Sequence, residues 1–184
     1  MEKFYNEDDE PNPANFYGLT KFLSEEYIKR NLENFYIFRF GWLIGNPKYD
    51  KKFTGKIFNK IANGETEFLG VNDQFGSISF ADQFAKDLKK VFEDKIQYGT
   101  YNYCTKSNIS RFDLLKKIVE YFTSNQSVKV EPISIDDFHP KLVASRPKYE
   151  LLSNSKSVAN NLISEVDFER ALFSFLYAQK KILR

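Results

Sequence analysis

Hydrophobic residues at helical spacing alternate along this chain with short, nearly continuous hydrophobic or aromatic runs. In residues 15–30, four of them recur every three or four positions, as on one side of a helix: Phe16, Leu19, Leu23 and Tyr27. Residues 35–40, with the sequence FYIFRF, then form a run that is typical of a buried strand. This order predicts strands and helices that alternate around a parallel sheet.

The same alternation continues to the end of the chain. Further strands are expected at residues 66–71, 99–104 and 128–132. Further helices are expected at about 57–61, 81–92, 110–121 and from 166 onward. The intervening residues predict loops at 41–52 and 135–147 and a turn at 73–76. The alternation places the chain in the α/β class.

Particular side chains make these predictions more specific. Ser110, followed three residues later by Asp113, is close to the capping box that begins many helices. Tyr101 and Tyr103 fall on one face of the strand at 99–104. In the helix at 81–92, one face is expected to carry Phe84, Ala85, Leu88 and Phe92.

Composition restricts the classes of function. The chain has 184 residues and a formal net charge of +2, so no basic excess marks a dedicated nucleic-acid binder. With one Cys and one His, we expect neither a disulfide framework nor a metal site. The sequence has no run of about 18 apolar residues, so we expect no transmembrane helix. The acidic start, MEKFYNEDDE, lacks the apolar part of a signal peptide, so we expect a cytoplasmic protein.

Tyr17 and Lys21 are the sharpest local candidates for chemistry. Four residues apart on a helix, they share one face and lie about 6 Å apart along its axis. A nearby ammonium favours the phenolate form of a tyrosine, which can then exchange a proton with a carbonyl or alcohol oxygen. The same spacing also arises by chance, with Tyr17 as a partly buried helix residue and Lys21 as a solvated one.

The surroundings of this pair are similar to a known family. Residues 11–21, PNPANFYGLTK, resemble the active-site helix of the extended short-chain dehydrogenase/reductases. Four further segments follow in the order found in the dTDP-4-dehydrorhamnose reductases: RFGWLIG at 39–45, DQFGSISFAD at 73–82, GTYN at 99–102, and Arg146-Pro147 followed by Leu152 and Lys156. The matches span nearly the whole chain.

The resemblance implies specific roles for several residues. Tyr17 would protonate the C4 carbonyl oxygen of a 4-keto nucleotide sugar while a hydride arrives from NADP or NAD. Lys21 would hold the cofactor ribose and stabilise the tyrosine phenolate. Trp42 would lie against the sugar. The alternative interpretation is that Trp42 is a core residue that follows a strand.

Three further residues would bind or shape the nucleotide end of the pocket. Asp73 and Gln74 would shape it, or would only cap the following turn. Arg146 would pair with the substrate diphosphate, for which a planar guanidinium is suited, or would form a surface ion pair. Glu150 departs from the family, which has a small polar residue there, so the local pocket shape is left open.

Two elements of the family pattern are missing from this sequence. The Gly-x-x-Gly-x-x-Gly turn that binds the dinucleotide is absent, and so is the strand that carries the family's catalytic Ser or Thr. Roughly a hundred residues, or about three βα units, would account for both. We therefore expect a partial Rossmann-like parallel sheet with the C-terminal substrate-binding lobe. Residues 1–184 would form a single domain or fragment, with the active-site helix and strand at 12–45 and the lobe at about 46–184.

The expected function follows from this organisation. The chain would be the substrate-binding part of a nucleotide-sugar 4-ketoreductase, inactive by itself, and would form a homo-oligomer or pair with a missing N-terminal half. A first alternative is a non-catalytic binding module that resembles the regulatory β subunit of methionine adenosyltransferase. A second is a nucleotide-sugar epimerase, although the Asp73-Gln74 and Arg146-Pro147 elements favour the reductase.

The remaining polar candidates have simpler interpretations. His139 is expected to be a polar loop residue, and Cys104 to pack as a small hydrophobic residue in a strand. The acidic run at 7–10 is expected to be a solvated arm, and Lys48 to lie in a solvated loop.

Overall fold

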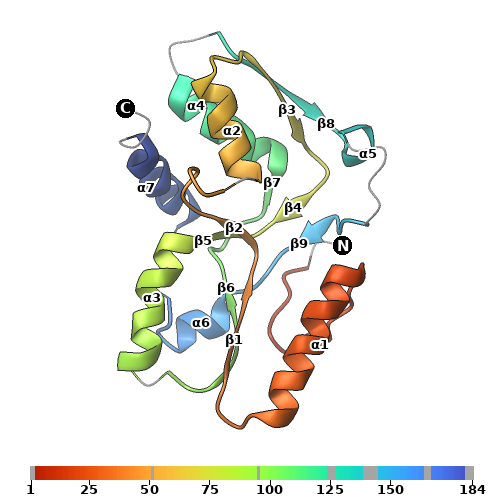
Figure 1. The fold of residues 1–184 in the computed structure, drawn as a ribbon, viewed down its shortest axis with the longest axis vertical. Helices are drawn as coiled ribbons and strands as arrows, with labels where there is room; N and C mark the ends of the chain where they lie inside the picture. Colours follow the sequence, from red (N-terminus) through yellow and green to blue (C-terminus); the bar gives the residue numbers. More distant parts are fainter. Residues whose placement is uncertain are drawn as a thin grey trace.

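The chain is described by a computed structural model, which covers residues 3–50, 52–94, 96–123, 127–138, 145–163 and 167–180. Two groups of elements follow one another along the long axis of the molecule (Figure 1). The lower group contains α1, β1, β6, α3 and α6, and the upper group contains α2, β3, α4 and β8. Short strands join the two groups near the middle.

The lower group is built on two parallel strands, β1 (Tyr36–Phe40) and β6 (Gly99–Tyr103). Helix α3 (Ala81–Glu93) and the short helix α6 (Ser155–Ala159) accompany them. The rings of Tyr101 and Tyr103 are buried on the same side, as the alternation predicts. Both strands and α3 lie where the sequence pattern predicts them.

The buried face of α3 differs in part from the expected one. Phe84 packs edge-on against the rings of Phe38 and Phe40, with ring centroids 5.1 and 4.8 Å apart. Phe92, however, is 75% exposed, and Val91 is the residue buried at that turn of the helix. The expected face is therefore wrong at Phe92 and also at Ala85, which is exposed, because the core lies beside Val91 at the C-terminal end of the helix.

Helix α1 (Phe16–Asn31) also forms where it is predicted. Its N-cap is Asn15, whose side-chain oxygen accepts a hydrogen bond from the Gly18 amide at 2.8 Å. No residue of α1 is buried. The hydrophobic positions that predicted the helix are all exposed: Phe16, Leu19, Leu23 and Tyr27. The periodic face of α1 is thus uncovered in this chain.

The expected loop after β1 contains a strand. β2 (Trp42–Ile44) pairs in parallel with β5 (Ile78–Phe80). Gly41 permits this close approach, since a Cβ there would lie 2.1 Å from the Ser77 carbonyl oxygen. Strands of three residues are too short to show a period in the sequence, which explains why the loop prediction was wrong here.

The upper group contains the larger hydrophobic core. Helices α2 (Phe53–Ala62) and α4 (Arg111–Thr123) pack with the parallel pair β3 (Glu67–Val71) and β8 (Lys129–Ile133). Helix α7 (Phe168–Lys180) closes this core from another side. Ser110 caps α4 as its spacing to Asp113 predicts: its Oγ accepts from the Asp113 amide at 2.9 Å and donates to the Asp113 carboxylate at 2.6 Å, which is one half of a capping box.

A small sheet lies between the two groups. Strand β4 (Phe75–Gly76) is its centre, antiparallel to β7 (Ile109–Ser110) and parallel to β9 (Tyr149–Glu150). The turn expected at 73–76 therefore ends in a strand. The loop expected at 135–147 begins with a short helix, α5 (Ile135–Phe138). His139 lies outside the described residues.

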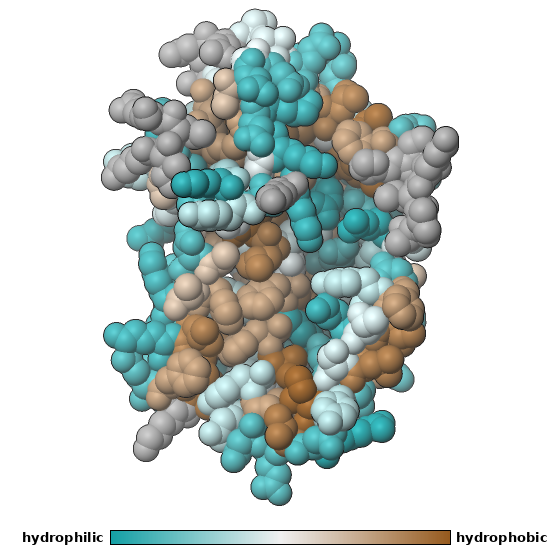
Figure 2. Space-filling model, in the orientation of Figure 1, coloured by the Kyte–Doolittle hydropathy of each residue, from teal (hydrophilic) through white to brown (hydrophobic). Residues whose placement is uncertain are grey.

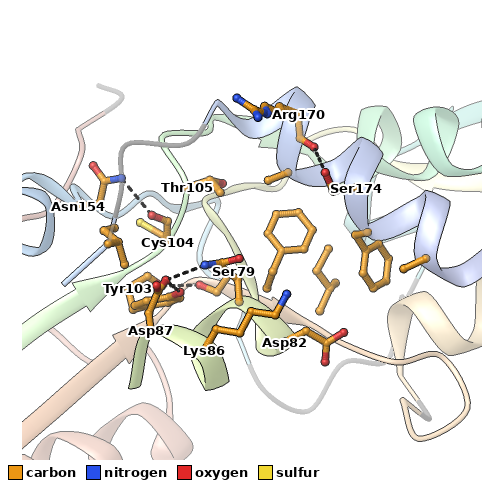
Figure 3. Close-up of a pocket in the computed structure, with 17 residues that line it drawn as sticks. Ser79, Asp82, Lys86, Asp87, Tyr103, Cys104, Thr105, Asn154, Arg170 and Ser174 are labelled. Atoms are coloured by element: carbon orange, nitrogen blue, oxygen red, sulfur yellow. Dashed lines mark hydrogen bonds between the residues drawn. The ribbon is translucent and has the colours of Figure 1, made fainter. Parts of the chain in front are cut away.

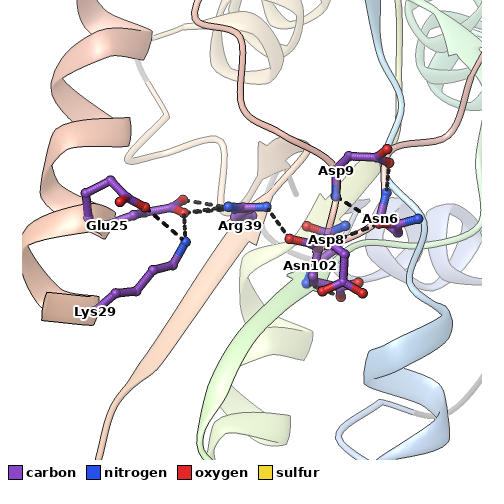
Figure 4. Close-up of polar contacts among 9 residues, drawn as sticks. Asn6, Asp8, Asp9, Glu25, Lys29, Arg39 and Asn102 are labelled. Carbon is purple, nitrogen blue, oxygen red and sulfur yellow. Dashed lines mark hydrogen bonds and ion pairs between the residues drawn. The ribbon is translucent and has the colours of Figure 1, made fainter. Parts of the chain in front are cut away.

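The acidic N-terminal segment is not a free arm, which corrects the sequence prediction. Tyr5 forms a parallel bridge with Leu152, and the Glu7 carboxylate accepts a hydrogen bond from the Asn102 amide at 2.7 Å. The Asn6 side chain accepts from the amides of Asp8 and Asp9 in a compact turn (Figure 4). Backbone pairing with distant residues, which periodicity does not report, holds this segment in place.

Within the described residues, no helix has the length and hydrophobicity that crossing a membrane requires.

Candidate functional site

Tyr17 and Lys21 lie together on the first turns of α1, as their spacing predicts. The Lys21 ammonium is 5.3 Å from the centre of the Tyr17 ring. The Tyr17 side chain is 70% exposed, and no described residue forms a hydrogen bond with its hydroxyl. The phenol and the ammonium are both open to a ligand that approaches this side of α1.

Helix α1 is attached to the rest of the molecule by polar contacts. The Arg39 guanidinium from β1 forms a two-pronged ion pair with Glu25, with an Nη2–Oε2 distance of 2.6 Å and an Nε–Oε1 distance of 3.0 Å (Figure 4). Arg39 also donates to the Glu7 carbonyl at 3.3 Å. At the start of α1, the Asn15 amide nitrogen donates to the Ser145 carbonyl at 3.0 Å. The start of α1, which carries Tyr17, is thus tied to the residue next to Arg146.

Trp42 lies at the centre of a second group of candidate residues. Its side chain is only 9% exposed, and its Nε1 donates to the Glu150 carboxylate at 2.8 Å. Gly76 packs against one face, since a Cβ there would lie 2.5 Å from the indole Cε2 atom. The Arg111 guanidinium stacks on the ring, 3.9 Å from its centre. Trp42 is therefore enclosed. A sugar would touch only the edge of the indole ring unless Arg111 moved away from its face.

Gln74 is held in the same group. It is 5% exposed, and its side-chain oxygen accepts a hydrogen bond from Arg111 Nε at 3.2 Å. Its carbonyl accepts a second bond from the Arg111 amide at 3.2 Å. Gln74 therefore positions Arg111, the first residue of α4.

Arg111 was not among the residues that the sequence singled out. Its environment is unusual, because burial lowers the pKa of its guanidinium. The Glu150 carboxylate raises this pKa, and the positive charge of Arg146 lowers it further. The one signal available in the sequence was its place directly after the helix cap Ser110. Its closeness to Trp42 and Gln74 arises only from pairing between β4 and β7.

The structure separates the other two predicted residues. Asp73 accepts a hydrogen bond from the Ile135 amide at 3.0 Å, so it caps α5. Arg146 is exposed and lies two residues before Lys148, whose carbonyl accepts from the Phe75 amide at 2.8 Å. Trp42, Gln74 and Arg146 thus lie in one region around the small central sheet, whereas Asp73 is directed to α5.

A cavity of about 240 Å³ lies elsewhere, between α3, the end of β6 and α7 (Figure 3). Tyr103 donates from its hydroxyl to Asp87 there at 2.7 Å, and burial together with this carboxylate raises the tyrosine pKa. Burial also raises the pKa of the Cys104 thiol to about 12, consistent with its predicted packing role. None of the six predicted site residues lines this cavity.

The described residues offer only part of a cofactor site. Tyr17 and Lys21 are accessible and have the chemistry to contact a nicotinamide ribose. The sequence contains no glycine-rich turn for the pyrophosphate, and neither of the two cavities described in the structure is lined by α1. No group of three or more metal-ligating side chains occurs among the described residues.

Comparisons with known proteins identify the relatives of this chain. The family described as RmlD substrate binding domain matches residues 1–180. A dTDP-4-dehydrorhamnose reductase of Mycolicibacterium smegmatis is 28% identical over 169 residues, which are 91% of this chain and 50% of that protein.

Solved structures give the same result. The crystal structure of dTDP-4-dehydrorhamnose reductase from Bacillus anthracis in complex with NADP is 28% identical, with a TM-score of 0.82, over 95% of this chain and 59% of that one. The Clostridium acetobutylicum enzyme has a TM-score of 0.84 at 27% identity, over 98% of this chain and 61% of that one. The chain thus spans about half to three fifths of the length of these relatives. Its α/β fold with parallel strands matches theirs over that part, and the chain belongs to the RmlD substrate binding domain family.

Proposed function

We propose that this chain is the substrate-binding part of an NADP- or NAD-dependent reductase that acts on the C4 keto group of a dTDP-linked 4-keto-6-deoxyhexose. The observation that carries the proposal is the pair Tyr17 and Lys21. They lie 5.3 Å apart, ring centre to ammonium, on an accessible helix face. The hydrogen bond from Asn15 to Ser145 ties that face to the segment that holds Arg146.

The chemistry of the pair suits a carbonyl reduction. A bound nicotinamide would supply the hydride. The Tyr17 hydroxyl would donate its proton to the C4 oxygen, where negative charge develops as the carbonyl is reduced. The Lys21 ammonium would balance the phenolate that remains. Trp42 and Arg146 would contact the sugar and its diphosphate, and Asp73 and Gln74 would shape the nucleotide end.

We also propose that the reaction requires a nucleotide-binding half that the described residues do not contain. Among them, β1 pairs with β6 alone, although parallel sheets are ordinarily covered on both faces and extended at their edges. Hydrophobic residues gather on the surface over β1 between α3 and α1, and along α1 (Figure 2). Such a surface favours association, either with an N-terminal half or with a second copy of the chain.

The division of the chain at about residue 45 remains a prediction. β6 follows that boundary by more than fifty positions and pairs with β1, which precedes it. The proposed active-site part therefore draws on both sides of the boundary.

A non-catalytic binding module is the second candidate. The exposed hydrophobic side of α1 favours it, because that surface would serve a partner equally well. In that case Tyr17 would contribute nothing to a reaction. An epimerase is a weaker alternative, since the Asp73-Gln74 and Arg146-Pro147 elements resemble the reductases.

Calorimetric titration of the isolated chain distinguishes these candidates. We expect a dTDP-sugar to bind, NADPH not to bind, and no NADPH oxidation to occur. Adding a separately expressed nucleotide-binding half of a relative should restore oxidation, and Tyr17→Phe should abolish it while leaving dTDP-sugar binding unchanged. Binding of neither ligand would favour the interaction module, and turnover by the isolated chain above the Tyr17→Phe control would contradict the proposed division.

A further inference from the structure

We propose that Arg111 binds the diphosphate group of the substrate together with Arg146, from the position where its guanidinium lies over Trp42. The proposal rests on the function proposed above for the chemical class of the ligand. The place of the site rests on the geometry of Arg111 itself.

The Arg111 guanidinium lies close to two aromatic rings. Its central carbon lies 3.9 Å from the centre of the Trp42 ring and 5.6 Å from that of Phe53. Such stacking is attractive and fixes the plane of the guanidinium. Gln74 fixes its rotation through the hydrogen bond to Nε. The group is therefore oriented before any ligand arrives, which lowers the entropic cost of binding.

Most of its hydrogen-bonding capacity is unused. A guanidinium has five N–H donors, and within the described part of the chain the bond to Gln74 is its only side-chain hydrogen bond. No described carboxylate forms an ion pair with it, and Glu150 instead accepts from Trp42 Nε1 at 2.8 Å. Among the described residues, the Nη groups of Arg111 thus keep donors that a ligand could use.

Two charged side chains act on Arg111: the Glu150 carboxylate offsets part of its charge, and Arg146 adds to it. A buried charge is costly unless it is paired. Arg146 adds a second positive charge that is close enough to affect the titration of Arg111. Planar guanidinium groups match the oxygens of phosphates in pairs. Two guanidinium groups beside a single carboxylate, Glu150, leave room for an anion, and a diphosphate could contact both of them at once.

The location also suits a nucleotide sugar. Arg146 follows Ser145, whose carbonyl is bound by Asn15 at 3.0 Å, and Asn15 lies two residues before Tyr17. A diphosphate held by Arg111 and Arg146 would leave the attached sugar beside the start of α1.

Calorimetry on the full chain tests this site with dTDP, inorganic pyrophosphate and thymidine as probes. We expect Arg111→Gln to weaken the binding of dTDP and pyrophosphate by about tenfold or more, as for the loss of charged hydrogen bonds. Thymidine, which has no phosphate, should bind both proteins equally. Arg30→Gln, which removes an exposed guanidinium on α1, is the matched control and should change nothing.

Each outcome decides between the inference and the proposed function. A folded Arg111→Gln protein with unchanged dTDP affinity overturns the role of Arg111 and leaves the function standing. Pyrophosphate binding that depends on Arg111, without dTDP binding, supports the anion site and contradicts the proposed substrate. Binding of no probe by the unmodified chain overturns both. If Arg111→Gln fails to fold, Arg111→Lys keeps the charge without the fork, and an unchanged dTDP affinity there overturns the proposal.

Discussion

The side chain of Asn15 both caps α1 and, through a hydrogen bond to Ser145, ties the start of that helix to the segment that carries Arg146. Its oxygen accepts from the Gly18 amide at 2.8 Å, and its nitrogen donates to the Ser145 carbonyl at 3.0 Å. The residue that begins α1 therefore also fixes the backbone next to Arg146. Since Tyr17 follows two positions later, one amide group sets the relative position of the proposed proton donor and the proposed diphosphate ligand.

Replacing Asn15 should separate its two roles. Asn15→Ala removes both bonds and should lower the free energy of unfolding by about 1 kcal/mol, which is typical of a lost helix cap. Asn15→Asp keeps an acceptor for Gly18 but cannot donate to Ser145. It should retain most of the stability and still weaken dTDP-sugar binding. Urea unfolding followed by circular dichroism, combined with calorimetry, checks both effects. Equal unfolding midpoints for Asn15→Ala and the unmodified chain would show that the cap is unimportant.

Gly76 should not tolerate a side chain. A Cβ there would lie 2.5 Å from Cε2 and 2.8 Å from Cδ2 of Trp42. Gly76→Ala should therefore cost roughly 1–3 kcal/mol of stability, as overpacking does, and should shift the fluorescence of the single Trp. Gly45→Ala, where the nearest described atom would be 3.3 Å away, is the milder control. Adding Trp42→Leu should rescue part of the Gly76→Ala loss, and strict additivity of the two changes would contradict this contact.

The Cys104 thiol should be unreactive in the folded chain. Burial raises its pKa to about 12, and the negative charge of Glu7 acts in the same direction against the opposing hydrogen bond with Ser77. An unperturbed cysteine has a pKa of about 8.5, so an exposed thiol would be largely ionised at pH 9. We expect slow alkylation by iodoacetamide at that pH, and rapid alkylation after unfolding in guanidinium chloride.

The pH dependence of stability gives a second readout for Cys104. Because its pKa is raised in the folded state, its contribution to stability is complete below the unfolded pKa and is lost as the pH rises towards about 12. The Cys104→Ala variant should therefore lose less stability than the unmodified chain as the pH is raised. Rapid alkylation of the native chain would contradict the burial of the thiol.

Asp50 should stabilise the start of α2 in a pH-dependent way. Burial opposes its ionisation, but hydrogen bonds from the Thr54 hydroxyl and from the amides of Lys52, Thr54 and Gly55 outweigh it and lower the pKa. A carboxylate whose pKa is lowered by folding stabilises the fold at a pH above its pKa in the unfolded state. This stabilisation is lost as the pH falls through its pKa in the folded state. Unfolding midpoints should therefore decline below about pH 4.

Asp50→Asn should reduce both the stability at neutral pH, by about 1 kcal/mol, and the acid sensitivity. Asp8→Asn, on an exposed residue of the N-terminal turn, is the comparison variant. Urea midpoints measured at pH 7 and pH 3 give the difference. An Asp50→Asn protein with the acid sensitivity of the unmodified chain would count against this role.

The longer elements could be predicted because each carries its own signal. α1, α3 and α4 repeat hydrophobic residues at helical spacing, and β1, β3, β6 and β8 have runs of five residues. The strands that were missed have two or three residues: β2, β4, β5, β7 and β9. Such strands exist because a distant partner supplies their hydrogen bonds, and a local pattern cannot report that.

The candidate site divides in the same way. The spacing of Tyr17 and Lys21 on one helix face followed from the sequence alone, since helix geometry is local. The burial of Trp42 between Gly76 and Arg111 did not, because it depends on the pairing of β4 with β7 and of β2 with β5. No periodicity connects position 42 with position 111.

The sequence by itself determined the order of the main helices and strands, the proposed proton donor and its cation, and the family to which the chain belongs. These properties depend on residue types at short spacing, so local propensity and side-chain chemistry are sufficient to define them. Only the tertiary structure decided that the hydrophobic side of α1 faces outward, that Trp42 is enclosed, and that the Arg111 guanidinium lies over its ring. Those properties depend on which distant segments exclude water from one another, and this is settled only when the whole chain packs.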